Sequence, residues 1–318
     1  MKRSKSTAGI IASFNQEQYI VEAVESLIHQ VDELIVVDDQ SSDGTLYELR
    51  TLQSAHSNLN VIKPSKKLGV SGAYNLAVME SDSKVLILQG GDDISLSNRV
   101  SNQVQVLDDP EVCISYSSPI IVNRNSHILP DQIGKEFQRD LIFEDVLAEL
   151  FFNGNFICAP SVAIRRSDYL RMGGFLANVD TLQDYALWLR CTAEGSARYS
   201  DVPFVKYRKH GNNLSRQNLR SYRSLHRENL ERNFVLNNFL DNCNPSTLKR
   251  LLRATSFQGP LQNETEQMLK VFIKMNHVNT DFRLSGVQDL LKYSQDSNFS
   301  EFEMRTYHNF IESLISAQ

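Results

Sequence analysis

The sequence predicts an α/β fold in which a doubly wound, mostly parallel sheet is followed by a C-terminal helical extension. In the first half, short runs that are apolar throughout alternate with segments whose apolar residues have helical spacing. Strands buried on both faces are typical of a parallel sheet covered by helices. Polar clusters follow these runs, and beyond Ser215 the pattern becomes helical only.

Four strands and three helices are expected within about the first 95 residues. The strands are the β-branched runs AGIIAS, ELIVVD, NLNVIK and KVLILQ. The helices span 19–30, 45–55 and 71–79, where apolar residues recur on one helical face. Asp43 precedes the second helix as a capping carboxylate would, so DDQSSDGT is expected to be the loop before that helix.

The second half is less regular. Helices are expected at 98–107, 139–152 and 181–195, and extended segments at VCISYSS, IIVN and ICAPSVAIRR. A long helix is expected from Arg216 to about Leu240, with further helices to Gln318. We therefore expect an α/β domain over 1–215, with halves of about 1–95 and 96–215, and a helical extension over 216–318.

Composition and charge argue against several classes of protein. The 318 residues are 41% hydrophobic and 22% charged, as in ordinary globular proteins, and the net charge of -5 argues against nucleic-acid binding. The four cysteines lack C-x-x-C spacing, which argues against a zinc site or disulfides and favours a reducing cytosol. Without a long apolar stretch or a signal peptide, the chain is expected to be cytoplasmic, or peripheral at the inner face of the plasma membrane.

Polar side chains follow each expected strand. Ser13 and Asn15 follow the first, Asp38-Asp39 end the second, the loop 66–75 follows the third, and Asp92-Asp93 follow the fourth. Each cluster alone is more often a turn or a helix cap. Because ligands bind outside the carboxyl ends of the strands in an open parallel sheet, we expect the clusters to converge on one crevice.

Adjacent carboxylates in such a crevice can bind a divalent cation, share a proton or cap a helix. Mg²⁺ and Mn²⁺ prefer one or two carboxylates together with phosphate oxygens. A carboxylate can also hold a ribose, which suits the pair Asp38-Asp39. The two pairs indicate a nucleoside diphosphate that carries a transferable group, with a metal ion on the diphosphate.

Seven blocks then follow one another in a recognisable order: SFNQEQYIVEAVESLIHQ, ELIVVDDQSSDGT, LGVSGAYNLAV, VLILQGGDD, CAPSVAIRRSDYLRMGGF, LQDYALWLRCTAEG and VKYRKHGNNLS. Together they resemble family 2 of the glycosyltransferases, whose GT-A fold is a Rossmann-like doubly wound sheet. The resemblance covers about residues 7–215. It implies that the first half of this domain binds a nucleotide sugar and that the second half binds an acceptor.

The resemblance also implies roles for individual residues. Asp184 would be the catalytic base, and Asp92 and His210 would hold Mn²⁺ or Mg²⁺. Asp39 would face the base or the ribose. The residues expected to contact the nucleotide sugar are Ser13, Asn15, Asp38, Asp39, Gly69, Asn75, Asp92 and Asp93.

Three positions depart from the family pattern. Gly90 stands where relatives carry another acid, Gln183 replaces the glutamate before the base, and Tyr74 stands where many members carry an arginine. None of these changes removes the expected metal ligand or the expected base. We therefore expect an active enzyme.

The implied reaction inverts the anomeric carbon, because the acceptor hydroxyl, deprotonated by Asp184, attacks the face opposite the nucleotide. The donor would be a UDP-, GDP- or dTDP-sugar. The acceptor would be a saccharide or a lipid-linked saccharide in bacterial surface polysaccharide synthesis.

Two other functions stay open at this point. Gly90 and Gln183 also fit a non-catalytic GT-A-like nucleotide-binding or scaffold protein. A sugar nucleotidyltransferase would carry a glycine-rich, arginine-containing loop after the first strand. This chain reads ASFNQEQY there, so we rank that function low.

One pattern lies in the extension. Four arginines recur at helical spacing, which places them on one face: Arg216, Arg220, Arg223 and Arg227. Such a stripe can contact anionic lipid headgroups or a lipid-linked diphosphate, which would give peripheral membrane contact. We favour the alternative, a solvated or dimer-facing helix, because charged helix faces are usually solvated.

Overall fold

The computed structural model describes residues 6–129, 137, 145–211, 213, 222–255 and 266–296. The chain divides into two compact units. The first comprises residues up to 146 together with 155–232, and the second comprises 147–154 together with the residues from 233 onward. The expected domain boundary near residue 215 stays a prediction.

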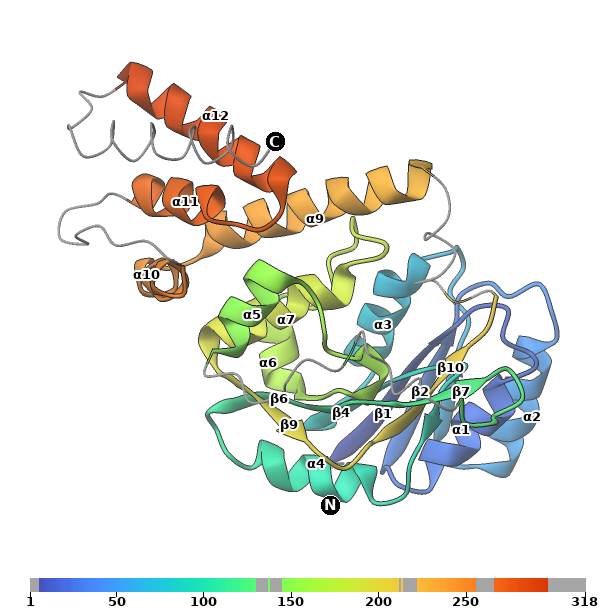
Figure 1. Ribbon diagram of the computed structural model, residues 1–318. Helices are drawn as coiled ribbons and strands as arrows, with labels where there is room; N and C mark the ends of the chain where they lie inside the picture. The colour runs from blue at the N-terminus through green and yellow to red at the C-terminus, as the bar shows by residue number, and fades with distance from the viewer. Residues whose placement is uncertain are drawn as a thin grey trace. The chain divides into compact units, whose positions relative to one another are not determined.

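The first unit is built on a mostly parallel sheet (Figure 1). Among the described residues this sheet has seven strands in the order β3-β2-β1-β4-β8-β6-β9. Only β8 runs antiparallel to its neighbours β4 and β6. The strands are β1 (Thr7–Ser13), β2 (Glu33–Asp38), β3 (Leu59–Ile62), β4 (Val85–Gly90), β6 (Val112–Ser117), β8 (Ala163–Arg165) and β9 (Ser196–Ser200). The predicted doubly wound, mostly parallel sheet is confirmed.

Helices cover both faces of the sheet (Figure 1). One face carries α1 (Ile20–Ile28), α2 (Thr45–Ala55) and α4 (Arg99–Leu107). The other face carries α3 (Gly69–Met79), α6 (Arg166–Arg171) and α7 (Gln183–Glu194). All but α6 coincide with predicted helices to within a few residues. The segment expected to be extended, ICAPSVAIRR, contains a 3₁₀ turn, Ala159–Ser161, before β8.

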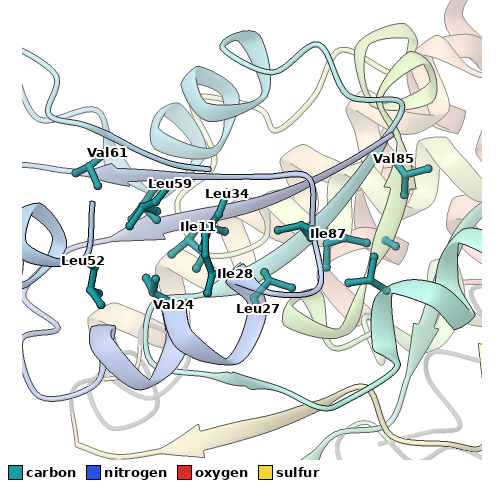
Figure 2. Close-up of a cluster of buried hydrophobic side chains, with 14 of the residues drawn as sticks. Ile11, Val24, Leu27, Ile28, Leu34, Leu52, Leu59, Val61, Val85 and Ile87 are labelled. Carbon is teal, nitrogen blue, oxygen red and sulfur yellow. The ribbon is translucent and has the colours of Figure 1, made fainter. Parts of the chain in front are cut away.

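Figure 2 shows the apolar core between the sheet and the helices on the face that carries α1, α2 and α4. Alternate residues of the strands point into it, and Leu34 of β2 meets Leu27 of α1 there. Burying each such side chain contributes roughly 1.5–3 kcal/mol. Gly9 permits the close approach, since a Cβ at this position would lie 2.8 Å from Leu27 Cδ2.

A smaller sheet joins distant parts of the sequence. It consists of β5 (Ile94–Ser95), β10 (Val205–Lys209) and β7 (Ile120–Asn123), with β10 in the middle. Strand β10 runs antiparallel to β5, with Lys206 opposite Ile94. Because β5 directly follows the sequence GGDD, this pairing brings the chain around His210 to the end of β4.

The described part of the second unit is helical. Phe151 is fully buried, with its ring centroid 6.0 Å from Phe239 and 6.1 Å from Phe282. The Nε2 atom of buried His277 lies 2.8 Å from the carbonyl oxygen of Phe151. The helices that contribute are α5 (Val146–Asn153), the end of α9 (Tyr222–Asn242), α10 (Pro245–Arg253), α11 (Glu266–Met275) and α12 (Thr280–Asp296).

Two predicted helices begin outside the described residues. The first is the helix expected from residue 139, of which the structure describes α5. The second is the helix expected from Arg216, of which it describes α9. Across the described ranges, none of the helices combines the length and the apolar character that a membrane span requires.

Candidate active site

The candidate site lies where the carboxyl ends of β1, β2 and β4 meet. Ser13 is paired with Asp38 across β1 and β2, and Ala12 is paired with Gly90 across β1 and β4. The ends of these three strands therefore form one edge, to which the smaller sheet adds the chain around His210.

Asp92 and His210 are in direct contact. The Nε2 atom of His210 lies 2.8 Å from Asp92 Oδ2. Asn213 fixes the backbone at His210, because its Oδ1 accepts a hydrogen bond of 2.6 Å from the His210 backbone N–H. The imidazole ring also stacks on Tyr19, with 4.9 Å between the centroids. The structure thus brings together the two residues expected to hold a metal ion.

Asp93 has a different environment from its neighbour. Its side chain is 2% exposed, and its Oδ1 accepts a 2.9 Å hydrogen bond from the backbone N–H of Arg208. Burial raises the pKa of Asp93 well above its usual range, and the charge of Asp92 raises it further. Its burial and its hydrogen bond to the backbone of β10 suit a role in the architecture of the site.

Arg208 is a central residue that the sequence reasoning missed. It is 1% exposed, and its guanidinium donates to Asp92 O at 2.7 Å and to Glu22 Oε2 at 2.6 Å. A third hydrogen bond reaches Ser126 Oγ at 2.9 Å, and the group lies over the ring of Tyr19. Its position two residues before His210 is the feature of the sequence that could have indicated its place in the site. Arg208 therefore ties the acid pair to α1 and to the turn after β7.

The missing acid at Gly90 has a structural counterpart. A Cβ at Gly90 would lie 2.6 Å from Asp93 Oδ2 and 2.8 Å from Asp92 Oδ1. The carboxylates of the acid pair therefore fill the volume that a side chain at this position would need. The neighbouring departure Tyr74 lies close by, since its hydroxyl donates to Gln89 O at 2.7 Å.

The carboxylates at the end of β2 differ in their contacts. Asp39 is 4% exposed, and its two oxygens accept hydrogen bonds from the backbone N–H groups of Leu68 (2.6 Å) and Gly69 (2.9 Å). It thereby caps the start of α3. Asp38 is fully buried, and its Oδ1 has no hydrogen-bond partner among the described residues. Within the same described ranges, the buried hydroxyl of Ser13, opposite Asp38, also has none.

The other residues expected at the nucleotide sugar shape loops. Asn15 has a positive φ of 53°, and its Oδ1 accepts a 2.8 Å hydrogen bond from Ser42 N. Gly69 has a φ of 72°, which favours glycine. Asn75 bonds through its side-chain amide to both backbone groups of Phe175. The hydroxyl of Tyr169 on α6 also donates to Asn75 Oδ1 at 2.6 Å, so the described side-chain hydrogen bonds of Asn75 go to α6 and to the loop before α7.

Asp184 lies in the first turn of α7 and is partly exposed. Its Oδ1 accepts a 2.7 Å hydrogen bond from Tyr185 N, and its Oδ2 accepts one of 2.9 Å from Asn155 Nδ2. Burial raises the pKa of Asp184 to about 6. Trp188 on the same helix is fully buried, as expected of a core residue.

Cys158 is a buried thiol directly before the 3₁₀ turn. Burial raises the pKa of Cys158 well above its usual value, and the charges of Asp93 and Asp184 raise it further.

The donor atoms around Asp92 suit a divalent cation that also binds phosphate. Searching only what is described of the chain, we find no group of three or more His, Cys, Asp or Glu side chains placed to hold a metal ion. Mg²⁺ and Mn²⁺ sites, however, need few protein ligands when phosphate oxygens complete the coordination. One carboxylate and one imidazole in contact, Asp92 and His210, fit that requirement.

The carboxyl groups and the histidine lie outside the carboxyl ends of the strands, where doubly wound α/β proteins bind their ligands, so the fold and the site define a ligand-binding α/β protein. Comparison with known families makes this specific. The family described as Glycosyl transferase family 2 matches residues 10–173. The chain belongs to this family and is a glycosyltransferase.

Curated relatives agree with this assignment. An uncharacterized glycosyltransferase of Haemophilus influenzae is 27% identical over 216 residues, which cover 65% of this chain and 66% of that protein. A relative from Escherichia coli, the UDP-Glc:alpha-D-GlcNAc-diphosphoundecaprenol beta-1,3-glucosyltransferase WfaP, is 25% identical over 218 residues, or 65% of this chain and 78% of that protein.

Solved structures share the fold. Residues 1–349 of TarS from S. aureus match with a TM-score of 0.58 at 15% identity, covering 98% of this chain and 92% of that chain. A mannosyltransferase from Pyrobaculum calidifontis, in complex with GDP-Man and Mn²⁺, matches with a TM-score of 0.55 at 16% identity, covering 99% and 81%. At these identities the likeness establishes the fold alone.

Proposed function

We propose that the enzyme transfers a sugar from a nucleoside diphosphate sugar to an acceptor hydroxyl with inversion of the anomeric carbon. The observation that supports this proposal most strongly is the environment of the Asp184 carboxyl group. Its carboxyl group is partly exposed, is fixed by two hydrogen bonds and has a pKa of about 6. A general base works best with a pKa near the working pH, and this value is closer to neutrality than that of an ordinary aspartate.

In the proposed reaction Asp184 accepts the proton of the acceptor hydroxyl. The hydroxyl oxygen forms its bond to the anomeric carbon while the bond to the diphosphate oxygen breaks, and the diphosphate leaves on the opposite face. Because the Asp184 side chain is partly exposed, an acceptor hydroxyl can reach its carboxylate.

Asp92 and His210 would hold Mn²⁺ or Mg²⁺ together with the diphosphate. Such an ion supplies positive charge that stabilises the leaving diphosphate. Asp93 and Arg208 keep Asp92 in place through the backbone contacts at the end of β4. The proposal also assigns the nucleotide sugar to Ser13, Asn15, Asp38, Asp39, Gly69, Asn75, Asp92 and Asp93.

The names of relatives guide the proposal for substrates. WfaP is named for UDP-Glc and a diphosphoundecaprenol-linked acceptor, and TarS structures include one with UDP-GlcNAc. We propose a UDP-, GDP- or dTDP-sugar as donor and a saccharide or lipid-linked saccharide as acceptor. A cytoplasmic role in bacterial surface polysaccharide synthesis, at the inner face of the membrane, follows from such an acceptor.

The helical extension over 216–318 is proposed to support membrane contact or a homodimer. Of the four arginines in the expected stripe, Arg216 and Arg220 lie outside the described residues. Arg227 pairs with Asp180 and with Glu231. Because these acids already face Arg227, we rank a solvated or dimer-facing role above lipid binding.

Asp184→Asn tests the proposed base. We expect the substitution to reduce sugar transfer to below a few per cent while nucleotide binding stays nearly unchanged. The assay follows UDP or GDP release from UDP-Glc, UDP-GlcNAc and GDP-Man in the presence of Mn²⁺. Glu194→Gln, an exposed change at the other end of α7, is the matched control and should keep full activity. Turnover of Asp184→Asn above a few per cent would show that the base is misassigned.

A further inference from the structure

Asn155 contacts Asp184 from a different segment of the chain. Its Nδ2 donates a 2.9 Å hydrogen bond to Asp184 Oδ2. The residue follows α5 and precedes the 3₁₀ turn, and 29 positions separate it from Asp184. The resemblance to relatives gave it no role, so this contact is seen only in the folded chain.

The surrounding backbone fixes how the Asn155 amide is turned. Its Oδ1 accepts a 3.1 Å hydrogen bond from the N–H of Ile157, so the amide nitrogen must be the atom that faces Asp184. The three residues that follow are each 1% exposed and anchor this stretch: Phe156, Ile157 and Cys158. A buried, ordered backbone therefore presents an N–H donor to the carboxylate.

We propose that Asn155 is a positioning residue, which holds the Asp184 carboxylate in the orientation that accepts the proton of the acceptor hydroxyl. This inference rests on the proposed function of Asp184. Tyr185 N donates a hydrogen bond to Asp184 Oδ1, and Asn155 Nδ2 donates one to Asp184 Oδ2. Because both carboxylate oxygens are bound, rotation about the Cβ–Cγ bond of Asp184 is restricted. Asn155 acts through Asp184.

The electrostatics around Asp184 agree with this role. Burial raises the pKa of Asp184, and the hydrogen bonds from Tyr185 N and Asn155 lower it. Within α7, Trp188 also contributes to lowering it. In the segment after Asn155, the charge of Asp184 raises the pKa of the buried Cys158 thiol, and so does the charge of Asp93. Loss of the Asn155 donor should therefore raise the pKa of Asp184 above about 6.

The pH dependence of stability measures this effect without any substrate. The pKa of Asp184 is about 6 in the folded protein and near 3.8 in the unfolded chain. Its contribution to stability is therefore fully present below pH 3.8 and is lost as the pH rises through about 6. The difference in melting temperature between the wild type and Asp184→Asn should change with pH as this contribution is lost. Measured from pH 4 to pH 8, this change, called the step below, reports the pKa of Asp184 in the folded protein.

The experiment compares two pairs: wild type with Asp184→Asn, and Asn155→Ala with the double variant. We expect the step in the second pair to end about one pH unit higher, the effect of losing one hydrogen bond to a charged group. The acid limb of kcat/KM should shift equally for whichever of the donors UDP-Glc, UDP-GlcNAc and GDP-Man is turned over. Asn153→Ala, whose exposed side chain bonds to Glu149, is the control and should leave the step in place.

The outcomes separate the two claims. A step at the same pH in both pairs would overturn the role of Asn155, even if Asp184→Asn is inactive. An active Asp184→Asn variant would instead overturn the proposed base itself. If Asn155→Ala does not fold, Asn155→Ser, whose shorter side chain cannot reach as far, replaces it, and its step should lie above the wild-type pH. A step at or below the wild-type pH would contradict the inference.

Discussion

At the end of β4, two glycines occupy positions where neighbouring polar groups take the place of a side chain. A Cβ at Gly91 would collide with Gln16 Oε1, and one at Gly90 would collide with the carboxylates of Asp92 and Asp93. The acid pair therefore occupies the space that a side chain at position 90 would need. Glycine at position 90 fits this placement of Asp92 and Asp93.

Gly90→Asp should consequently fail to improve the enzyme. The new side chain must displace the buried Asp93, which accepts a hydrogen bond from Arg208 N, and overpacking of this kind typically lowers stability by about 1–3 kcal/mol. Urea unfolding measures the change. Gly211→Ala is the control, because no atom lies within 4 Å of its would-be Cβ. A more stable or more active Gly90→Asp variant would contradict this arrangement.

The Asp184 carboxyl group should set the acid limb of the pH profile. Below its pKa of about 6 the group is protonated and cannot accept a proton, so kcat/KM should fall about tenfold per pH unit there and level off above. Initial rates from pH 4.5 to 8 test this. A profile that is flat through pH 6 would exclude Asp184 as the titrating base.

At the scale of single elements, the residues at the ends of β1 and β2 have two roles: one stabilises the fold, and the others lie at the candidate site. Asp39 caps α3 with both oxygens, while Asp38 and Ser13 each keep a buried oxygen that has no partner in the described part of the chain. Buried unpaired polar atoms are rare in native proteins. Their presence at the edge where the nucleotide sugar is proposed to bind is consistent with that proposal.

Asp39→Asn tests the structural part of this arrangement. An amide supplies one acceptor oxygen where the carboxylate supplies two, so one N–H group at the start of α3 loses its partner. We expect a loss of stability of about 1–2 kcal/mol, measured by urea unfolding in the absence of nucleotide. Asp82→Asn, an exposed acid after the same helix, should change it by less than about 0.5 kcal/mol. Equal effects would argue against the cap.

The elements that sequence reasoning predicted are those with strong periodicity. Strands β1, β2 and β4 contain continuous apolar runs, and α1 to α4 and α7 show helical spacing. The short helix α6 spans only six residues, too few to show a period. Strand β9 reads SARYS and is largely accessible, so it lacks the apolar pattern of a buried strand.

The site was less predictable than the fold. Arg208, Glu22 and Ser126 are far apart in the sequence and meet only because β10 pairs with β5 and β7. The direction of β8 was equally hidden, since an apolar run reads the same in a parallel or an antiparallel strand. The resemblance to relatives pointed to Asp184. The hydrogen bond that Asn155 donates to Asp184 could not be predicted, because it depends on how the segment around Asn155 folds.

For the whole molecule, the division into units does not follow the order of the chain. The second unit takes residues 147–154 from within the first, and Phe151 is its most buried aromatic contribution from that segment. The described C-terminal helices therefore have part of their core supplied by a segment that precedes Asn155. Folding of the second unit depends on both parts of the sequence.

Phe151→Ala should weaken the second unit selectively. Removing a buried phenylalanine that contacts Phe239, Phe282 and His277 typically lowers stability by about 3–5 kcal/mol. Hydrogen exchange should accelerate in α11 and α12 and stay near the wild-type rate in β1 to β4. The control is Phe234→Ala, a phenylalanine of α9 that is 42% exposed. Equal acceleration in both units would show that they unfold as one.

The most direct test of the account is the melting temperature with UDP, GDP, dTDP or CDP, each with and without Mn²⁺. The central claim is that Asp92 and His210 hold a cation with the donor diphosphate. One nucleotide at about 100 times its Kd should stabilise the wild type by about 2.7 kcal/mol, which raises the melting temperature by roughly 5 °C, and only when Mn²⁺ is present. Asp92→Asn should lose this shift. No shift with any nucleotide, or an equal shift without the metal, would contradict the claim.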